Sequence, residues 1–432
     1  MHIFFSGIGG TGIGPLALLA KQAGYDVSGS DKQDSQYIEY LKNHGITDIH
    51  IGQTEAALST VHQAKPIDWY VYSSALVKEN PHPPEMAFIV SQGIKHSKRD
   101  EFLNYILEQK QLKLIAIAGT HGKSTTTAMV VWLFKELGIP ISYSVGAKIE
   151  FGDMGQYDPA STYFVYECDE FDRNFLAFHP YMSIISGIAW DHHEVFPTAE
   201  NYNQAFRDFL SQSELKTILT EDSQTLSIKN DESYSIVDES DDGYSELTLS
   251  GTVNRHDAWL AIDAVSQLTK EPLNRLITIM NEFPGLSRRM EELIPNLYTD
   301  YAHTPEKITG AMGTAQEIAK ENGQNVVVVY EPLTNRRMHY TRDQHMDIFT
   351  GASALYWVPS YLAREDPQQP ILTPSELIES LNPTIRNMAK PMELNGDLKV
   401  AIQSHLDNGD MILALSGGGG NSLDEWLRGE FV

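Results

Sequence analysis

The chain has 432 residues, enough for about three domains of roughly 150 residues each. Apolar residues make up 41% of it and charged residues 21%, a composition that excludes disorder as the main state. The 32 Lys and Arg against 58 Asp and Glu leave a net charge of −26, which excludes a general nucleic-acid binder and requires any phosphate site to be local.

Cysteine content and the N-terminus indicate the compartment. A single cysteine, Cys168, cannot form an internal disulfide, a cysteine-rich zinc site or a redox pair. The segment after Met1 lacks the basic start of a signal peptide, and no apolar run is long enough to cross a membrane. We therefore expect a cytoplasmic protein, a monomer or homodimer, that has neither nucleic acid nor a membrane as a partner.

Apolar runs alternate with helical stretches along the chain. The first run, 2–6, is followed by a predicted helix over 13–23 and a second strand over 25–30. Further strands are expected at 67–73, 112–118, 163–167, 182–188, 326–330, 354–358 and 411–415. Further helices are expected at 123–136, 257–268, 305–320 and 398–406. Such alternation predicts an α/β fold with mainly parallel sheets that are covered on both faces.

This pattern restarts twice after its beginning, at Leu112 and Leu297. The restarts predict three domains with boundaries near 109 and 290, that is 1–109, 110–290 and 291–432. Within the second domain the polar stretch 221–251 contains short alternating runs at 233–237 and 247–249. We expect this stretch to form an antiparallel meander on the central sheet.

The sharpest motif is Gly119-Thr120-His121-Gly122-Lys123-Ser124-Thr125, between a predicted strand and a predicted helix. Glycines in such a loop let backbone N–H groups face phosphate oxygens, and the helix N-terminus adds partial positive charge. Lys123 can bridge terminal phosphates, and Ser124 can bind Mg²⁺. The motif is shorter than GxxxxGK[ST], because Ile117 occupies the first glycine position. It predicts an ATP site formed by all seven residues.

Acidic and histidine side chains follow two further predicted strands. Glu167 ends the strand at 163–167 and precedes Cys168-Asp169-Glu170, and the strand at 182–188 is followed by Asp191-His192-His193. Carboxyl ends of parallel strands meet at one edge of a sheet, so these segments should lie beside the phosphate loop. Mg²⁺ needs few protein ligands, and Ser124 with Glu167 would suffice for one ion. A solvated acidic loop is the plainer alternative.

A second glycine segment, Gly7-Ile8-Gly9-Gly10-Thr11-Gly12, follows the first predicted strand, and Asp31 lies about 20 residues further on. Alone, this pattern is typical of a dinucleotide fold and indicates NAD and an oxidoreductase. Hydride transfer does not require a phosphate loop with an acidic metal site. An N-terminal domain that holds a different nucleotide diphosphate explains both motifs together.

Together these segments resemble the Mur ligases, ATP-dependent enzymes that assemble the cytoplasmic peptide stem of peptidoglycan. The resemblance covers nearly the whole chain and includes Ser73-Ser74-Ala75, Asn254 and the segments 283–289, 300–305 and 416–420. It implies an N-terminal Rossmann-like domain for the UDP-sugar, a central P-loop domain for ATP and Mg²⁺, and a C-terminal Rossmann-like domain for the incoming amino acid.

The resemblance also implies roles for individual residues. Lys123 would steady the β- and γ-phosphates, Ser124 and Glu167 would bind one Mg²⁺, and His192 would bind a second ion or the substrate oxygens. The remaining nucleotide contacts would be Asn254 to adenine, Asp300 to ribose, Arg289 or its neighbour Arg288 to the terminal phosphate, and His303 nearby. The UDP-sugar would lie against Gly7, Gly9, Gly10, Thr11, Gly12, Asp31, Ser73 and Ser74.

The implied reaction joins an amino acid to UDP-N-acetylmuramate. The lactyl carboxylate takes the γ-phosphoryl group of ATP, and the amine then displaces phosphate from the acyl phosphate. The glycine segments and Gly29-Ser30-Asp31 resemble the branch that adds L-alanine. The segment 331–337 is closer to the branch that recycles a murein tripeptide, and 300–305 to the branches that add diaminopimelate or lysine. We expect L-alanine, because the N-terminal segment and the phosphate loop fit that branch better, and the murein tripeptide is the alternative.

Three positions depart from the family pattern. Ser186-Gly187-Ile188 replaces Thr-Asn-Ile, and Asp257 replaces the second asparagine of the adenine helix. Arg207 lies near the position where several Mur ligases have a carbamylated lysine, so that modification is expected to be absent.

Overall fold

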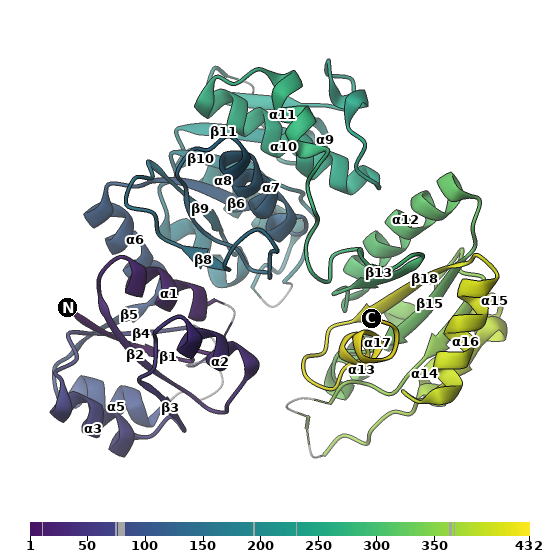
Figure 1. Ribbon diagram of the computed structural model, residues 1–432, viewed down its shortest axis with the longest axis horizontal. Coiled ribbons are helices and arrows are strands. Elements are labelled where there is room, and N and C mark those ends of the chain that lie inside the picture. The colour runs from purple at the N-terminus through teal and green to yellow at the C-terminus, as the bar shows by residue number, and fades with distance from the viewer. Residues whose placement is uncertain are drawn as a thin grey trace. The chain divides into compact units, whose positions relative to one another are not determined.

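The computed structural model describes residues 1–10, 12–73, 76, 83–192, 195–229, 231–362, 365–366 and 368–432. The chain forms two compact units, and Figure 1 labels their helices and strands. The first unit comprises Met1–Leu247 and His256–Pro284, and the second comprises Thr248–Arg255 and Gly285–Val432. The first unit contains two sheets and the second contains one.

The first sheet has five parallel strands in the order β3-β2-β1-β4-β5. Phe5 packs against Phe102 on one face of β1, whereas Phe4 belongs to the core of the other face with Leu58. Both faces are therefore covered, as predicted. The elements are β1 (His2–Ser6), α1 (Gly14–Gln22), β2 (Asp26–Asp31), α2 (Gln36–Asn43), β3 (Ile49–Ile51), α3 (Glu55–Ala64), β4 (Trp69–Tyr72), α5 (Pro84–Ser91), β5 (Lys95–Lys98) and α6 (Arg99–Lys110).

The second sheet has the order β12-β11-β10-β6-β9-β7-β8, and only β8 is antiparallel to its neighbour among the described strands of this sheet. Its strands are β6 (Lys113–Ala118), β7 (Ser142–Ser144), β8 (Gly155–Gln156), β9 (Tyr163–Glu167), β10 (Met182–Ile185), β11 (Leu215–Leu219) and β12 (Tyr234–Val237). The helices are α7 (Lys123–Glu136), α8 (Ala199–Ser211), α9 (Thr220–Thr225), α10 (Thr252–Thr269), α11 (Leu273–Met280) and the 3₁₀ helices η1 (Phe171–Ala177) and η2 (Tyr244–Glu246).

The third sheet, in the second unit, has the order β13-β14-β18-β15-β16-β17 and is parallel except for β13. Its strands are β13 (Glu291–Ile294), β14 (Leu297–Asp300), β15 (Val326–Glu331), β16 (Ala354–Trp357), β17 (Ala389–Pro391) and β18 (Met411–Ser416). The helices are α12 (Pro305–Asn322), α13 (Asn335–Thr341), α14 (Pro374–Ile378), α15 (Pro383–Met388), α16 (Gly396–Asp407), α17 (Leu423–Phe431) and the 3₁₀ helix η3 (Arg342–His345).

The α/β architecture with three mainly parallel sheets is as predicted, but the antiparallel meander at 221–251 is wrong. The run at 233–237 forms β12, which pairs with β11 in parallel, and 247–249 forms no strand. A strand at the edge of a parallel sheet has one partly solvated face, so its residues alternate as those of an antiparallel hairpin do. The domain boundaries near 109 and 290 stay predictions.

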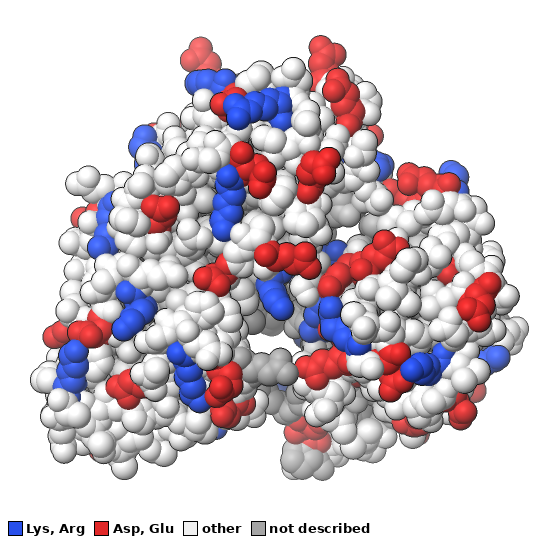
Figure 2. Space-filling view, viewed as in Figure 1, with Lys and Arg blue, Asp and Glu red and all other residues white. Residues whose placement is uncertain are grey.

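Surface charge agrees with the composition. Acidic side chains are spread over the visible face, and basic side chains lie among them (Figure 2). Among the described residues, no helix combines the length and the apolar character that crossing a membrane requires.

Candidate active site

The three strands that carry the predicted ATP motifs are neighbours in the central sheet, in the order β10-β6-β9. The phosphate loop follows β6, the acidic segment ends β9, and the segment with Ser186-Gly187-Ile188 follows β10. Because all three strands are parallel, their carboxyl ends share one edge. The structure thus brings these motifs together, whereas His193 lies outside the described residues.

Glycine is required at two positions of the phosphate loop. Gly119 and Gly122 have φ angles of +154° and +75°, which other residues rarely adopt. A Cβ on Gly119 would lie 2.6 Å from the Ser186 hydroxyl, and one on Gly122 would lie 2.5 Å from a carboxylate oxygen of Asp257. The loop therefore folds tightly onto two neighbouring segments before α7 begins.

Lys123, the first residue of α7, forms an ion pair with Glu170. Its Nζ atom lies 2.7 Å from Oε2 of Glu170 and also donates to the carbonyl of Gly119. Burial disfavours the ammonium, but the charges of Glu170 and Glu167 outweigh burial and raise the pKa of Lys123. Glu170 is only 1% exposed. Burial disfavours its carboxylate as well, yet Lys123 and His192 lower the pKa of Glu170 to about 2.

Ser124 and Glu167 meet as the sequence predicts. The Ser124 hydroxyl donates to Oε2 of Glu167 at 2.8 Å, and Glu167 pairs with Ile117 in the β6–β9 ladder. A hydroxyl and a carboxylate are oxygen donors of the kind that Mg²⁺ prefers. Among the described residues, no group of three His, Cys, Asp or Glu could hold a metal. An ion here would therefore take most of its ligands from water and phosphate.

His192 lies beside Glu170. Its Nε2 atom is 3.6 Å from Oε1 of Glu170, and its ring contacts Phe171 edge-on. Burial disfavours the imidazolium, but Glu170 and Asp191 outweigh burial and raise the pKa of His192. His192 is therefore a cationic or hydrogen-bonding group at this edge of the sheet, and its role as a metal ligand stays a prediction.

Two further side chains that are not among the predicted site residues contact the loop. The Tyr202 hydroxyl, on α8, lies 2.7 Å from Oγ1 of Thr120 and donates to Glu170 at 3.4 Å. The Ser186 hydroxyl donates to the carbonyl of His121 at 2.6 Å. Glu170 thus connects Lys123 of α7, Tyr202 of α8 and His192 of the segment after β10. No motif identifies a tyrosine at this distance along the chain.

Two departures from the family pattern now have a physical account. A Cβ on Gly187 would overlap the His121 ring, so the glycine makes room for that side chain. Burial raises the pKa of Asp257 well above its usual value. A neutral carboxyl presents one donor and one acceptor, as the asparagine it replaces would.

The N-terminal glycine segment is fixed by β2. The backbone N–H groups of Gly7 and Ile8 donate to the Ser30 carbonyl at 2.8 and 3.0 Å. The N–H of Gly9 donates to Oδ2 of Asp31 at 2.8 Å. The Asp31 carboxylate is thus bonded to the glycine loop. In an NAD-binding domain the residue at this position would instead bind the ribose hydroxyls. Ser73 follows β4 at the same edge, while Thr11 and Ser74 lie outside the described residues.

The predicted residues of the second unit gather around Tyr301. The guanidinium carbons of Arg288 and Arg289 lie 4.7 and 5.5 Å from its ring centre. Asp300 accepts hydrogen bonds from two backbone N–H groups, and burial raises its pKa. Burial and nearby cations lower the pKa of His303 to about 3, so the ring is neutral.

Asn254 lies at the start of α10 and donates to the Ser250 carbonyl at 2.8 Å. The contacts of Asn254, Arg289, Asp300 and His303 with a nucleotide stay predictions.

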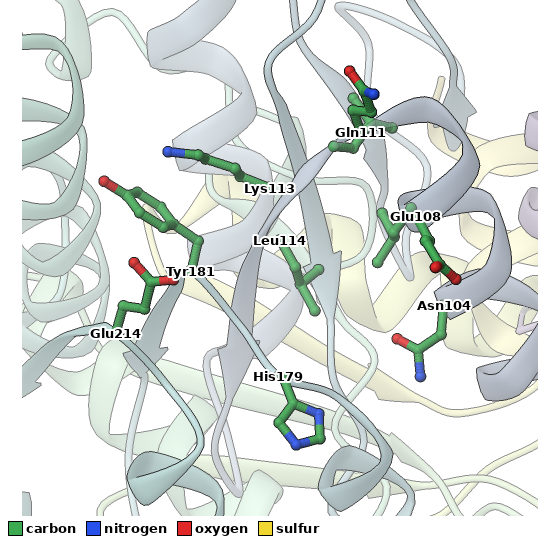
Figure 3. Close-up of a pocket in the computed structure, with 10 residues that line it drawn as sticks. Asn104, Glu108, Gln111, Lys113, Leu114, His179, Tyr181 and Glu214 are labelled. Carbon is green, nitrogen blue, oxygen red and sulfur yellow. The ribbon is translucent and has the colours of Figure 1, made fainter.

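A polar pocket of about 360 Å³ lies at the other edge of the central sheet (Figure 3). Lys113 begins β6 there, and its Nζ atom is 4.0 Å from the ring centre of Tyr181. His179 and Glu214 also line the pocket. Ligands of parallel sheets bind at the carboxyl ends of strands, so this pocket does not belong to the predicted site.

Comparisons with known proteins identify the family of the chain. Residues 2–111 match the Mur ligase family, catalytic domain, and residues 117–261 match the Mur ligase middle domain. The UDP-N-acetylmuramate–L-alanine ligase of Campylobacter jejuni subsp. doylei is 28% identical over 396 residues, which cover 85% of this chain and 87% of that protein.

Two solved structures share the fold. The UDP-N-acetylmuramate–alanine ligase MurC of Thermotoga maritima has a TM-score of 0.75 at 23% identity, covering 97% of this chain and 96% of that one. A murein peptide ligase of Psychrobacter arcticus has a TM-score of 0.58 at 22% identity with the same coverage. The matched segments contain both glycine loops and the acidic strand end, and the chain belongs to the Mur ligase family.

Proposed function

We propose that this protein is an ATP-dependent ligase that joins L-alanine to UDP-N-acetylmuramate and releases ADP and phosphate, a cytoplasmic step of peptidoglycan synthesis. One observation carries the proposal. A phosphate loop meets an acidic strand end, with Lys123 at 2.7 Å from Glu170 and Ser124 at 2.8 Å from Glu167. The Campylobacter relative, whose alignment covers 85% of this chain, is named for UDP-N-acetylmuramate and L-alanine and supports these two substrates.

The reaction follows from charge and position. A carboxylate oxygen of the lactyl group attacks the γ-phosphorus of ATP, and the bond to the ADP oxygen breaks. The amine of L-alanine then attacks the acyl carbon, loses a proton and expels inorganic phosphate. Lys123 and the loop N–H groups stabilise negative charge on the phosphoryl oxygens. Mg²⁺ on Ser124 and Glu167 would neutralise further phosphate charge, and His192 would face the substrate oxygens.

The domains divide this work in the proposal. Residues 1–109 bind the UDP-sugar through Gly7 to Gly12, Asp31 and the Ser73-Ser74 turn. Residues 110–290 bind ATP and Mg²⁺. Residues 291–432 supply Asp300 and His303 to the nucleotide and complete the site for the amino acid. Arg289, just before that domain, contacts the terminal phosphate, and Asn254 contacts adenine.

The murein tripeptide is the alternative to L-alanine as the amine substrate. The sequence of 331–337 favours it, but Glu331 is buried and bonds to Ser416 and to the N–H of Leu423. The first residue of that segment therefore supports the fold rather than an acceptor. An NAD-dependent oxidoreductase lacks support, because the Asp31 carboxylate that would bind the ribose already accepts from the N–H of Gly9. The family membership favours a UDP-sugar.

The test supplies the protein with UDP-N-acetylmuramate, ATP, Mg²⁺ and one acceptor at a time, and follows phosphate release. We expect release with L-alanine that exceeds release with glycine about 10- to 200-fold, the range that one methyl group contributes in a hydrophobic pocket. Release with the tripeptide alone would assign the recycling reaction instead. Release without any UDP-sugar would assign another acid substrate.

A further inference from the structure

Arg99 lies at the edge of the first sheet where the proposed UDP-sugar segments gather. It follows β5 directly and is the first residue of α6. Gly7 follows β1, Asp31 ends β2 and Ser73 follows β4, and these strands are parallel. Arg99 therefore belongs to the same ligand-facing edge of the sheet, although no sequence motif contains it.

The glycine segment is shaped around the Arg99 side chain. A Cβ built on Gly12 would overlap the Nη1 atom of Arg99 and lie 3.2 Å from its Cζ atom. Any residue other than glycine at this position would displace the guanidinium. A cationic group thus lies directly against the loop proposed to bind a diphosphate.

Neither carboxylate beside Arg99 lies close enough for a short charge-assisted hydrogen bond. Nε lies 3.4 Å from Asp100, and Nη2 lies 3.6 Å from Asp169. Both distances exceed the roughly 2.7–2.9 Å of a charge-assisted hydrogen bond. A guanidinium has five N–H donors in a planar fork, which matches two phosphate oxygens. The side chain is 19% exposed, so a ligand atom can reach it.

Asp169 connects this cation with the ATP site. It stands between Glu167, the proposed Mg²⁺ ligand, and Glu170, the partner of Lys123. On the other side, α6 leads from Arg99 into β6, the strand that precedes the phosphate loop (Figure 1). A ligand bound at Arg99 therefore lies beside the acidic segment 167–170.

We infer that Arg99 binds the diphosphate of the UDP-sugar beside the acidic segment 167–170, an inference that rests on the proposed function. A diphosphate carries two negative charges, and a chain of net charge −26 needs a local cation to bind it. The diphosphate is favoured over the lactyl carboxylate because Gly12 lies just before α1, which begins at Gly14, and the N-terminus of a helix stabilises phosphate.

The experiment measures dissociation constants by calorimetry in the absence of turnover. The probes are UDP, UDP-N-acetylglucosamine, which lacks the lactyl carboxylate, UDP-N-acetylmuramate, and ATP with Mg²⁺. The variants are Arg99→Gln and Arg99→Lys, and the control is Arg275→Gln. Arg275 is an exposed arginine on α11 that pairs with Glu271 at 2.7 Å.

We expect Arg99→Gln to weaken all three UDP ligands about 10- to 100-fold, the worth of one to two charge-assisted hydrogen bonds. ATP affinity should stay within about twofold, which also shows that the variant is folded. Arg99→Lys should lose less, because it keeps the charge but not the fork. Gly12→Ala, which displaces Arg99 without removing it, should also weaken the UDP ligands.

Equal affinity of Arg99→Gln and the unaltered protein for all UDP ligands would overturn the inference and leave the proposed function intact. A loss confined to UDP-N-acetylmuramate would assign Arg99 to the carboxylate and overturn the diphosphate contact. A protein that binds ATP but none of the UDP ligands would contradict the proposed function itself, and the inference with it.

Discussion

Replacing Lys123 by alanine is expected to lower kcat for phosphate release about 10³-fold, the cost of removing one preorganised electrostatic group from a transition state. The ammonium is fixed by the helix start, by the Gly119 carbonyl and by Glu170, so it is in place before the phosphoryl group moves. Phosphate release with saturating ATP, UDP-N-acetylmuramate and L-alanine measures the effect.

Two further variants separate chemistry from folding. Lys123→Arg keeps the charge and can pair with Glu170, so the fold is preserved, but its longer side chain should still lower kcat more than about 10-fold. Lys42→Ala removes a lysine on α2 that pairs with Glu39 at 2.9 Å and should leave kcat within about twofold. Normal turnover of Lys123→Ala would contradict the assignment of the phosphate loop to ATP.

Replacing Glu170 by glutamine is expected to have the second large effect on kcat. Glu170 acts by positioning Lys123 and does not itself contact the substrate. Glu170 is 1% exposed and holds Lys123, so its loss leaves a partly buried ammonium without its counter-charge. Breaking such a buried pair costs about 3 kcal/mol of the free energy of unfolding. We expect kcat to fall about 100-fold, because Lys123 and His192 both lose their common partner.

Matched variants test this positioning role. Glu170→Asp keeps the charge and should recover part of kcat, whereas a purely structural role would give both variants the same activity at equal stability. Glu200→Gln removes an exposed glutamate on α8 that pairs with Arg207 and should leave kcat and stability unchanged within error. Full activity of Glu170→Gln at saturating ATP would contradict the role.

Glu170→Gln also changes how the free energy of unfolding depends on pH in acid. The folded state holds the pKa of Glu170 at about 2, below its usual value of 4.5. Glu170 therefore stabilises the fold above pH 4.5, and this contribution is lost as the pH falls toward 2. Denaturant unfolding at several pH values should show the unaltered protein losing about 3 kcal/mol more than Glu170→Gln over this range. Parallel pH curves for the two proteins would contradict the ion pair.

The buried strands could be predicted because their chemistry is local. The runs at 112–118 and 163–167 are continuous apolar segments, as strands covered on both faces require, and they form β6 and β9 with nearly the expected bounds. The short strands β7, β8 and β17 have two or three residues and few apolar positions, so no periodic pattern marks them. The edge strand β12 is parallel to β11 rather than antiparallel as predicted, because alternation does not distinguish the two kinds of pairing.

The site shows the same division between local and long-range information. Ser124 and Glu167 could be expected to meet, because each ends or follows a strand at one sheet edge. Glu170 reaches Lys123 only because the chain turns into η1 just after it, and Tyr202 and Arg99 come from helices elsewhere in the chain. These contacts depend on packing between distant segments. The one signal for Glu170 in the sequence is that the segment Glu167-Cys168-Asp169-Glu170 holds more acidic residues than a single Mg²⁺ requires.

The central claim is that the γ-phosphate of ATP meets a sugar-linked carboxylate beside Lys123 and Glu167. A crystal structure with a non-hydrolysable ATP analogue, Mg²⁺ and UDP-N-acetylmuramate tests it most directly. The account predicts a γ-phosphate oxygen about 3 Å from Nζ of Lys123. It also predicts Mg²⁺ about 2.1 Å from oxygens of Ser124 and Glu167. A nucleotide bound at another edge of the central sheet, with Lys123 still paired only to Glu170, would contradict it.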